Sequence, residues 1–300
     1  MMIAAIVSFV IAAVLFHPTP ALAWGPVTHI ALGVQVLATV ITPDHPLQAA
    51  LTNLPEVFLY GGLAPDIVQG RRFQSRLRRH SHNWSTGVGL LNSARGNHER
   101  AFAYGYLAHL AADVVAHNFF LPARFIGRYD RGVSSHIYNE ACFDAIQDAD
   151  YRDLLLKLLS LDFRALDAIL KRAIDSPFVA FSAHRAVFEG GLKRIQQWHR
   201  VIRAIGGDVR IDRADAELFS QASCGAIAGI LELGGEAACC RFDPMGVQAL
   251  SRALASRRSL QRLTRMGPEA RKTSHDLAAS MLNDLLTHLR QTPFGGASEV

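Results

Sequence analysis

One apolar stretch, residues 104–120 with the sequence YGYLAHLAADVVAHNFF, most constrains the fold because it carries ionisable side chains at four-residue intervals. His109, Asp113 and His117 fall on one stripe of an α-helix, since residues four apart differ in direction by only about 40°. The stripe points two imidazoles and a carboxylate out of an otherwise hydrophobic helix. Buried polar groups cost free energy unless they are satisfied, and a metal ion satisfies all three. The stretch therefore predicts part of a metal site.

A second pair of potential ligands, His136 and Glu140, begins sixteen residues after the end of this stretch. The two residues are again four apart, so they share one face of a helix. Either motif alone is compatible with a hydrogen-bonded histidine in the core of an unrelated helix. The order HxxxDxxxH followed by HxxxE favours a shared metal site over two independent core contacts.

The composition indicates a folded chain with a substantial core. Half of the 300 residues are hydrophobic and 19% are charged, which disfavours disorder. The formal charge of +5 is modest, and much of the basicity lies in one cluster. This cluster is either a binding surface for phosphates or anionic lipid headgroups, or a solvated loop beside the site. Its members are Arg71, Arg72, Arg76, Arg78 and Arg79.

The cysteine pattern argues against a thiolate metal site. None of the four cysteines belongs to a CxxC motif, and two of them are adjacent. If the protein is exported, a disulfide between Cys224 and one of the adjacent pair is compatible with the sequence. The four are Cys142, Cys224, Cys239 and Cys240.

The amino-terminal residues 1–23 have the pattern of a cleavable signal peptide. An apolar run over residues 3–16 precedes two prolines and the small-x-small sequence Ala21-Leu22-Ala23. The run is shorter than the roughly 20 residues that a membrane-spanning helix needs. No Lys or Arg precedes it, so an uncleaved amino-terminal membrane anchor stays as the alternative. We expect export to the periplasm or the medium, with Trp24 as the first mature residue.

The mature chain, residues 24–300, predicts one all-α domain. Apolar residues recur at three- and four-residue spacing, and strand-like alternation is scarce. Glycine and proline break the pattern at residues 58–67, which we expect to be a turn carrying Asp66, and at residues 121–133, which we expect to be a loop. Helices are expected over residues 27–39, 43–53, 82–94, from about 100, from 136, and over 151–159, 163–174, 183–205, 214–233, 245–254 and 269–290.

Two further candidate ligands stand between the first helix and the central motif. Asp66 lies in LAPDIV and His82 lies in RRHSHNW, where His80 competes for the same role. Each is weak evidence alone, because an Asp after Pro is usually a cap or turn residue. Near the amino terminus, a free α-amino group and carbonyl on Trp24 would form a chelate, which His29 could join.

The order of these motifs resembles the bacterial zinc-dependent phospholipase C family. Related fungal single-strand-specific zinc nucleases share the layout, and the close spacing in HLAADVVAH is similar to the amino-terminal domain of glycosylphosphatidylinositol-specific phospholipase D. The resemblance covers roughly residues 24–140 and implies an all-α domain that holds up to three zinc ions. Glu140 matches the phospholipases, whereas the Trp-Gly start with His29 is more similar to the nucleases. The interval from Asp113 to His117 is shorter than in the secreted enzymes.

The resemblance also implies how the ligands are shared among the ions, residue by residue. One zinc would be held by Asp66, His82, His109 and Asp113. A second would be held by His117, His136 and Glu140. A third would be held by the amine and carbonyl of Trp24, by His29 and by a bridging Asp113.

Zinc with nitrogen and oxygen ligands suits hydrolysis more than a closed structural role. We expect a phosphoric diester hydrolase of the phospholipase C type, in which zinc-bound hydroxide attacks phosphorus and Asp66 orients or deprotonates the water. Its substrate would be a phospholipid or another phosphodiester, with peripheral contact to a membrane surface. The alternatives are a nuclease or phosphomonoesterase, and a non-catalytic headgroup-binding protein. A nuclease would need stacking platforms for bases, for which the candidates are Trp84, Phe119, Phe120, Tyr129 and Tyr138.

Overall fold

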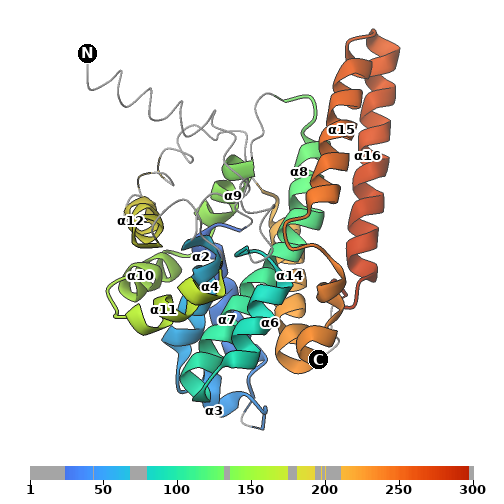
Figure 1. Cartoon of the computed structure of the whole chain (residues 1–300). Coiled ribbons are helices and arrows are strands. Elements are labelled where there is room, and N and C mark those ends of the chain that lie inside the picture. Colours follow the sequence, from blue (N-terminus) through green and yellow to red (C-terminus); the bar gives the residue numbers. More distant parts are fainter. Residues whose placement is uncertain are drawn as a thin grey trace, which may run out of the picture.

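The computed structural model describes residues 24–42, 44–67, 80–131, 136–174, 181–192, 197, 200 and 211–296. Every regular element in these ranges is a helix, so the predicted all-α fold is confirmed (Figure 1). No helix in the described ranges is long and apolar enough to cross a membrane. Residues 1–23 and the basic cluster at 71–79 lie outside the described residues, so the signal peptide and that surface stay predictions.

The core is built around α7 (Gly96–Val115), which is buried on almost every side from Ala101 onward. A helix that is apolar all round must be covered all round. The helices that cover it are α2 (Pro26–Thr39), α4 (Pro55–Ile67), α6 (Trp84–Ser93) and α14 (Arg213–Leu233). The metal motif predicted from sequence therefore lies on the most enclosed helix of the fold.

The predicted turn at residues 58–67 is wrong, because α4 runs unbroken to Ile67. Pro65 lies inside the helix, two residues before its end. Its missing N–H removes only one backbone hydrogen bond, to Gly61, so the helix survives. Asp66 is consequently held in the last turn of a rigid helix and not in a loop.

The glycines of α4 serve helix packing. A methyl group on Gly61 would overlap the carbonyl oxygen of Phe102, and one on Gly105 would overlap that of Phe58. The backbones of α4 and α7 therefore touch at this crossing, which only residues without a β-carbon permit. The glycines that suggest a turn in the sequence are instead needed for the close contact between these two helices.

The predicted loop at residues 121–133 is also helical over its first half. After α7, the chain makes a π-helical turn, η1 (Ala116–Phe120), and continues as α8 (Leu121–Gly127). Pro122 lies in the first turn of α8, where a missing N–H is tolerated. The helical path thus extends from Gly96 to Gly127, with His117 inside the π turn.

Most other predicted helices are confirmed within two residues at each end. There are three exceptions. The helix predicted from about residue 100 begins at Gly96, and the helix predicted at 245–254 continues to Thr264. Of the helix predicted at 43–53, the described residues 44–53 form only the short helix α3 (Gln48–Leu51). Of the helix predicted at 183–205, the structure describes the part up to 192. The remaining elements are α9 (His136–Ala145), α10 (Ala149–Leu158), α11 (Arg164–Ala173), α12 (Phe181–Leu192), the 3-10 turns Gly234–Glu236 and Ala238–Arg241, α15 (Val247–Thr264) and α16 (Pro268–Gln291).

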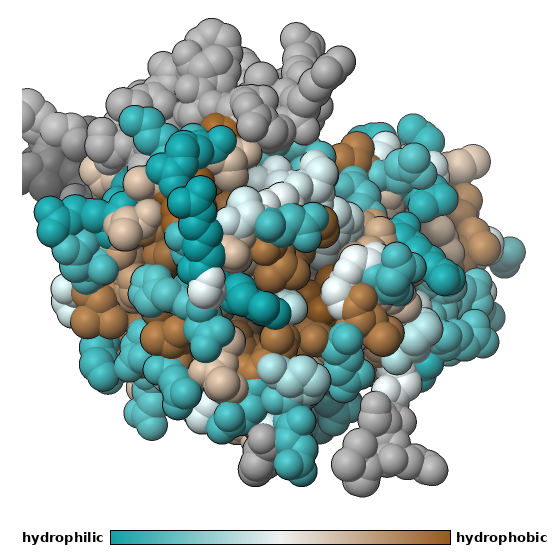
Figure 2. All heavy atoms as spheres, turned by 60° about the horizontal axis from the view of Figure 1, so that its bottom comes forward, coloured by the Kyte–Doolittle hydropathy of each residue, from teal (hydrophilic) through white to brown (hydrophobic). Residues whose placement is uncertain are grey.

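The carboxy-terminal helices α15 and α16 form an antiparallel hairpin beside α8 (Figure 1). The hairpin rises beyond the body of the molecule at the upper end of that view. On the opposite, lower face, hydrophilic side chains surround hydrophobic ones that gather in the middle (Figure 2). The helical body is therefore a bundle around α7, with one element that projects from it.

The close contact between α4 and α7 predicts a large loss of stability for Gly105→Ala. The added methyl group meets a backbone carbonyl that cannot rotate away, and such overpacking costs about 1–3 kcal/mol. Gly89→Ala is the matched control, because Gly89 is an exposed position within α6 with open space around it. That change should raise the unfolding free energy by about 0.5–1 kcal/mol. Thermal unfolding of both variants tests the contact, and equal midpoints would contradict it.

Candidate metal centre

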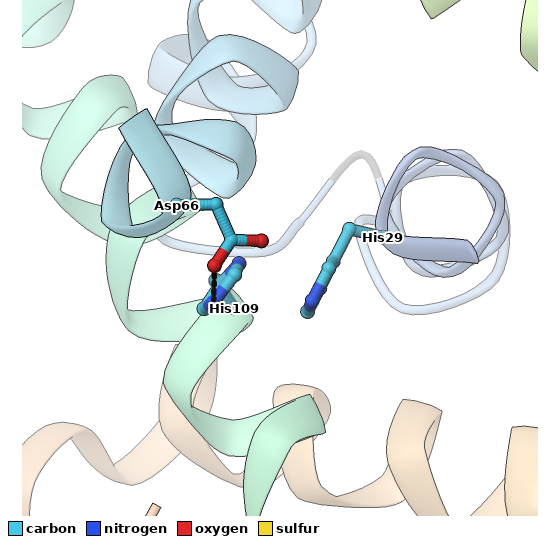
Figure 3. Close-up of side chains that lie close together, drawn as sticks. All are labelled: His29, Asp66 and His109. Atoms are coloured by element: carbon cyan, nitrogen blue, oxygen red, sulfur yellow. Dashed lines mark ion pairs between the residues drawn. The ribbon is translucent and has the colours of Figure 1, made fainter. Parts of the chain in front are cut away.

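Five buried side chains from four parts of the chain converge beside α7. Figure 3 shows three of them: Asp66 from α4 and His109 from α7 meet, and His29 reaches toward them from α2. The ligand atoms fall into two overlapping groups, and within each group all atoms lie within 4.8 Å of one another. These groups are His29, Asp66 and His109, and His82, His109 and Asp113.

Asp113 lies at the centre of the cluster and is 0% exposed. Its Oδ1 is 3.3 Å from His29 Nε2, and its Oδ2 is 3.3 Å from His109 Nε2 and 3.6 Å from His82 Nε2. Within the described part of the chain, neither carboxylate oxygen has a partner that meets hydrogen-bond geometry. A fully buried carboxylate among three imidazoles is costly unless a cation neutralises it.

Asp66 also lies beside His82, which precedes α6, and His109 of α7. Its Oδ1 lies 3.3 Å from His82 Nε2 and 3.9 Å from His109 Nε2. His82 is buried immediately before Asn83, whose side chain caps α6, whereas His80 is half-buried and belongs to neither ligand group. Of the two competing histidines, the structure brings His82 into the cluster.

The hydrogen bonds made by the Nδ1 atoms of His109 and His82 orient the two rings, so that their Nε2 atoms face the cluster. His109 Nδ1 lies 2.8 Å from the carbonyl oxygen of Gly62, which can only accept, so Nδ1 carries the proton. In the neutral ring, Nε2 then presents a lone pair, and it faces Asp113 and His82 Nε2 at 3.1 Å. His82 Nδ1 is in turn 2.9 Å from Ser81 Oγ. The lone pair on His109 Nε2 thus faces the Asp113 carboxylate, and a metal ion placed between them would accept both donors.

The electrostatics agree with this arrangement. Burial alone would raise the pKa of Asp113, but the adjacent His109 and His29 imidazoles hold that pKa well below its ordinary value. Burial, followed by the nearby His109, lowers the pKa of His29, so the ring is neutral. An ionised Asp113 and a neutral His29 are protonation states that metal binding requires.

The residues predicted for a second ion are placed only in part. His117 is fully buried in η1, with Nδ1 2.5 Å from the carbonyl oxygen of Pro244, and Glu140 is buried in α9. His136 opens α9, but its side chain lies outside the described residues. Neither His117 nor Glu140 belongs to the two ligand groups, so the second site stays a prediction.

Trp24 begins the described chain with its indole fully buried. The ring packs against Phe120 and Phe143, with centroids 4.7 and 4.2 Å away, and its Nε1 donates a 3.2 Å hydrogen bond to Ser223 Oγ. The indole therefore anchors the amino end of α2, whose first turn carries His29. The role of the Trp24 amine and carbonyl as ligands stays a prediction.

Asp144, on α9, is a residue of the site that our sequence reasoning missed. Its carboxylate accepts hydrogen bonds from the backbone N–H of Val27 (3.3 Å) and from the N–H and hydroxyl of Thr28 (2.7 and 2.8 Å). A side chain on Gly25 would overlap this carboxylate. Asp144 thus caps α2 from a distant helix and fixes the turn before His29. The sequence feature that could have identified Asp144 is its position four residues after Glu140, on the same face of the helix.

All four cysteines are free, so no disulfide joins Cys224 to the adjacent pair. None of them belongs to the described ligand groups. The cluster offers only nitrogen and oxygen ligands.

Comparison with models of known protein families identifies the family of this chain. The family model described as zinc dependent phospholipase C matches residues 28–183, more than half of the chain. The chain belongs to the zinc-dependent phospholipase C family. Searches of curated proteins and of solved structures find no match. The matched range contains all five clustered side chains.

The donor set fits the zinc that this family requires. Imidazole nitrogens and carboxylate oxygens without thiolates are typical of hydrolytic zinc sites. The buried Asp113 oxygens and His29 Nε2, which lack hydrogen bonds among the described residues, supply the donors that a cation would satisfy. His29, Asp66, His82, His109 and Asp113 are therefore the residues that would hold metal.

The cap on α2 predicts that Asp144→Ala weakens metal binding. Without the carboxylate, the turn that orients His29 loses three hydrogen bonds, and changes of this kind typically cost 10- to 100-fold in metal affinity. Asp144→Asn keeps one acceptor oxygen and should lie closer to the parent. Competition with a coloured zinc chelator measures the affinities.

Asp212→Ala is the control for this experiment. Asp212 caps α14 through a 2.8 Å hydrogen bond from the Ala214 N–H, and this bond is exposed. Its loss should lower the unfolding midpoint and leave zinc affinity unchanged. If both alanine variants bind zinc as the parent does, Asp144 has no positioning role.

Proposed function

We propose that this protein is an exported, zinc-dependent phosphodiesterase that hydrolyses phospholipids at the headgroup phosphate. The observation that carries the proposal is the buried Asp113 carboxylate within 3.6 Å of three histidine Nε2 atoms, with Asp66 beside them. Membership of the zinc-dependent phospholipase C family supports both the metal and the hydrolytic chemistry. Export rests on the signal-peptide pattern of residues 1–23.

The side chains of the cluster prepare the chemistry by orientation and charge. His109 is fixed by Gly62 and His82 by Ser81, so both Nε2 atoms point inward before any ligand arrives. Asp113 holds negative charge between His29 on one side and His82 and His109 on the other. When bound, zinc supplies an activated water nucleophile at neutral pH and charge stabilisation for the phosphate oxygens.

Asp66 is the carboxylate that we propose orients or deprotonates the attacking water. It lies in the last turn of α4, and its Oδ1 lies 3.3 Å from His82 Nε2. The rigid α4–α7 contact keeps its backbone fixed against the helix that carries His109 and Asp113. A general base must be held within hydrogen-bond reach of the proton that it takes, and a helix holds it more rigidly than a loop.

The aromatic side chains favour the phospholipase over the nuclease alternative. Phe119, Phe120 and Tyr129 are buried in the core and cannot stack on bases. Trp84 is half-buried, and its Nε1 donates a 2.9 Å hydrogen bond to the carbonyl oxygen of Phe242. Of the five candidates, Tyr138 is the other half-buried residue. Single-strand binding depends on several stacking platforms, so this arrangement supports it poorly.

A substrate panel tests the proposal. The zinc-loaded protein should hydrolyse phosphatidylcholine or phosphatidylinositol faster than single-stranded DNA or a chromogenic phosphomonoester. A chelator should stop the reaction, and zinc should restore it. Asp113→Asn removes the central charge and should lower both zinc content and turnover by about a hundredfold or more. Asp276→Asn, at an exposed position on α16, is the control and should match the parent.

Two results would overturn the assignment in different ways. Faster cleavage of the nucleic acid would replace the phospholipase with a nuclease and leave the metal centre intact. Full zinc loading without turnover of any substrate would favour a non-catalytic headgroup-binding protein.

A further inference from the structure

The tip of the α15–α16 hairpin exposes a large apolar side chain. Met266 lies in the short connection between the helices and is 76% exposed, more than any other large hydrophobic residue in the described chain. The connection stands at the far end of the hairpin, beyond the helical body (Figure 1). An unbranched, flexible side chain at a projecting tip is suited to enter an apolar surface.

Cations surround this methionine. Residues 258–273 hold five basic side chains against one carboxylate, Glu269, whereas the whole chain has a formal charge of only +5. All five are exposed, and none forms an ion pair with a carboxylate in the described part of the chain. These cations are Arg258, Arg262, Arg265, Arg271 and Lys272.

The hairpin is fixed to the body of the protein below its tip. Ser274 Oγ lies 2.8 Å from the Tyr129 hydroxyl and 2.9 Å from Thr264 Oγ1, which ties both hairpin helices to the end of α8. Gln261 Nε2 donates a 2.8 Å hydrogen bond to the carbonyl oxygen of Tyr129. Ser274 and Tyr129 are buried, so this polar junction is protected from water. The tip is therefore presented in a fixed orientation.

The turn itself requires special backbone chemistry. Gly267 has φ +124°, a conformation that side-chain-bearing residues rarely adopt, and Pro268 opens α16. At the other end of the hairpin, Gly246 packs so closely on His117 that a methyl group there would overlap its β-carbon. The tip and the metal-centre region are thus joined through one rigid element.

We propose that the hairpin tip, residues 258–273, is a docking site for an anionic lipid surface. Met266 enters the acyl boundary, and the five cations contact headgroup phosphates around it. Basic residues near such a surface each contribute attraction that salt screens. The exposed methionine favours a lipid surface over a nucleic acid, which offers no apolar layer for it. The proposal concerns a surface outside the metal centre and stands whichever substrate that centre cleaves.

Vesicle sedimentation tests this docking site. The purified protein is mixed with vesicles of equal parts phosphatidylglycerol and phosphatidylcholine, or of phosphatidylcholine alone. The neutral vesicles report any binding that does not depend on the charge of the lipid. We expect binding to the anionic vesicles that weakens as salt rises. The double variant Arg265→Glu with Arg271→Glu should bind them at least about tenfold more weakly.

The matched control reverses two exposed cations at the opposite end of the molecule. Arg95 and Arg100, at the start of α7, are exposed and lie far from the hairpin tip (Figure 1). Their double change to Glu alters the net charge equally and should leave vesicle binding within about twofold of the parent. Met266→Ser should weaken binding without altering its salt dependence, because it removes apolar contact and no charge.

Turnover of a water-soluble phosphodiester should be the same in the tip variants and the parent. This measurement separates docking from catalysis. If the protein binds vesicles through the tip but turns over no substrate, the docking site is supported and the proposed catalytic function is not. Equal loss of binding in the tip and control variants would overturn the proposal, because net charge and not the tip would then be responsible. Binding of single-stranded DNA but not of anionic vesicles through the tip would also overturn it.

Discussion

The fold depends on one buried carboxylate for which the described residues supply no hydrogen bond. Asp113 is enclosed in a helix that is buried on almost every side, and three imidazole nitrogens face it. Leaving such charge without a cation costs several kcal/mol, and a bound metal ion would remove that cost. The surrounding architecture serves to hold this centre: α4 touches α7 through glycine, and Asp144 caps the helix that carries His29.

The hydrogen bonds behind the ligands explain why the site is preformed. Gly62 and Ser81 hold the outer nitrogens of His109 and His82, so the inner nitrogens are oriented by the fold itself. Helices, not loops, carry most of these groups, and rigid elements keep a catalytic geometry more accurately. A hydrolytic zinc site of the family to which the chain belongs is the chemistry that this geometry suits.

The sequence predicted the residues of the metal centre better than the helices that hold them. Four-residue spacing reveals His109 and Asp113 because helix periodicity is a local property. Gly61 and Pro65 were misread as a turn, since a backbone contact between α4 and α7 overrides local preference. The helix after His117 was missed because a π turn allows Pro122 to start a new helical turn. Asp144 acts on residues more than a hundred positions away, which no local pattern reveals.

The most direct test of the central claim is anomalous X-ray diffraction at the zinc edge, on crystals of the zinc-saturated protein. The account predicts anomalous density within bonding distance of Asp113, at about 2.0–2.2 Å from its carboxylate and from histidine Nε2 atoms. Density on both sides of the carboxylate would show that Asp113 bridges two ions. Absence of any anomalous density at Asp113, with its carboxylate hydrogen-bonded only to protonated histidines, would contradict the account.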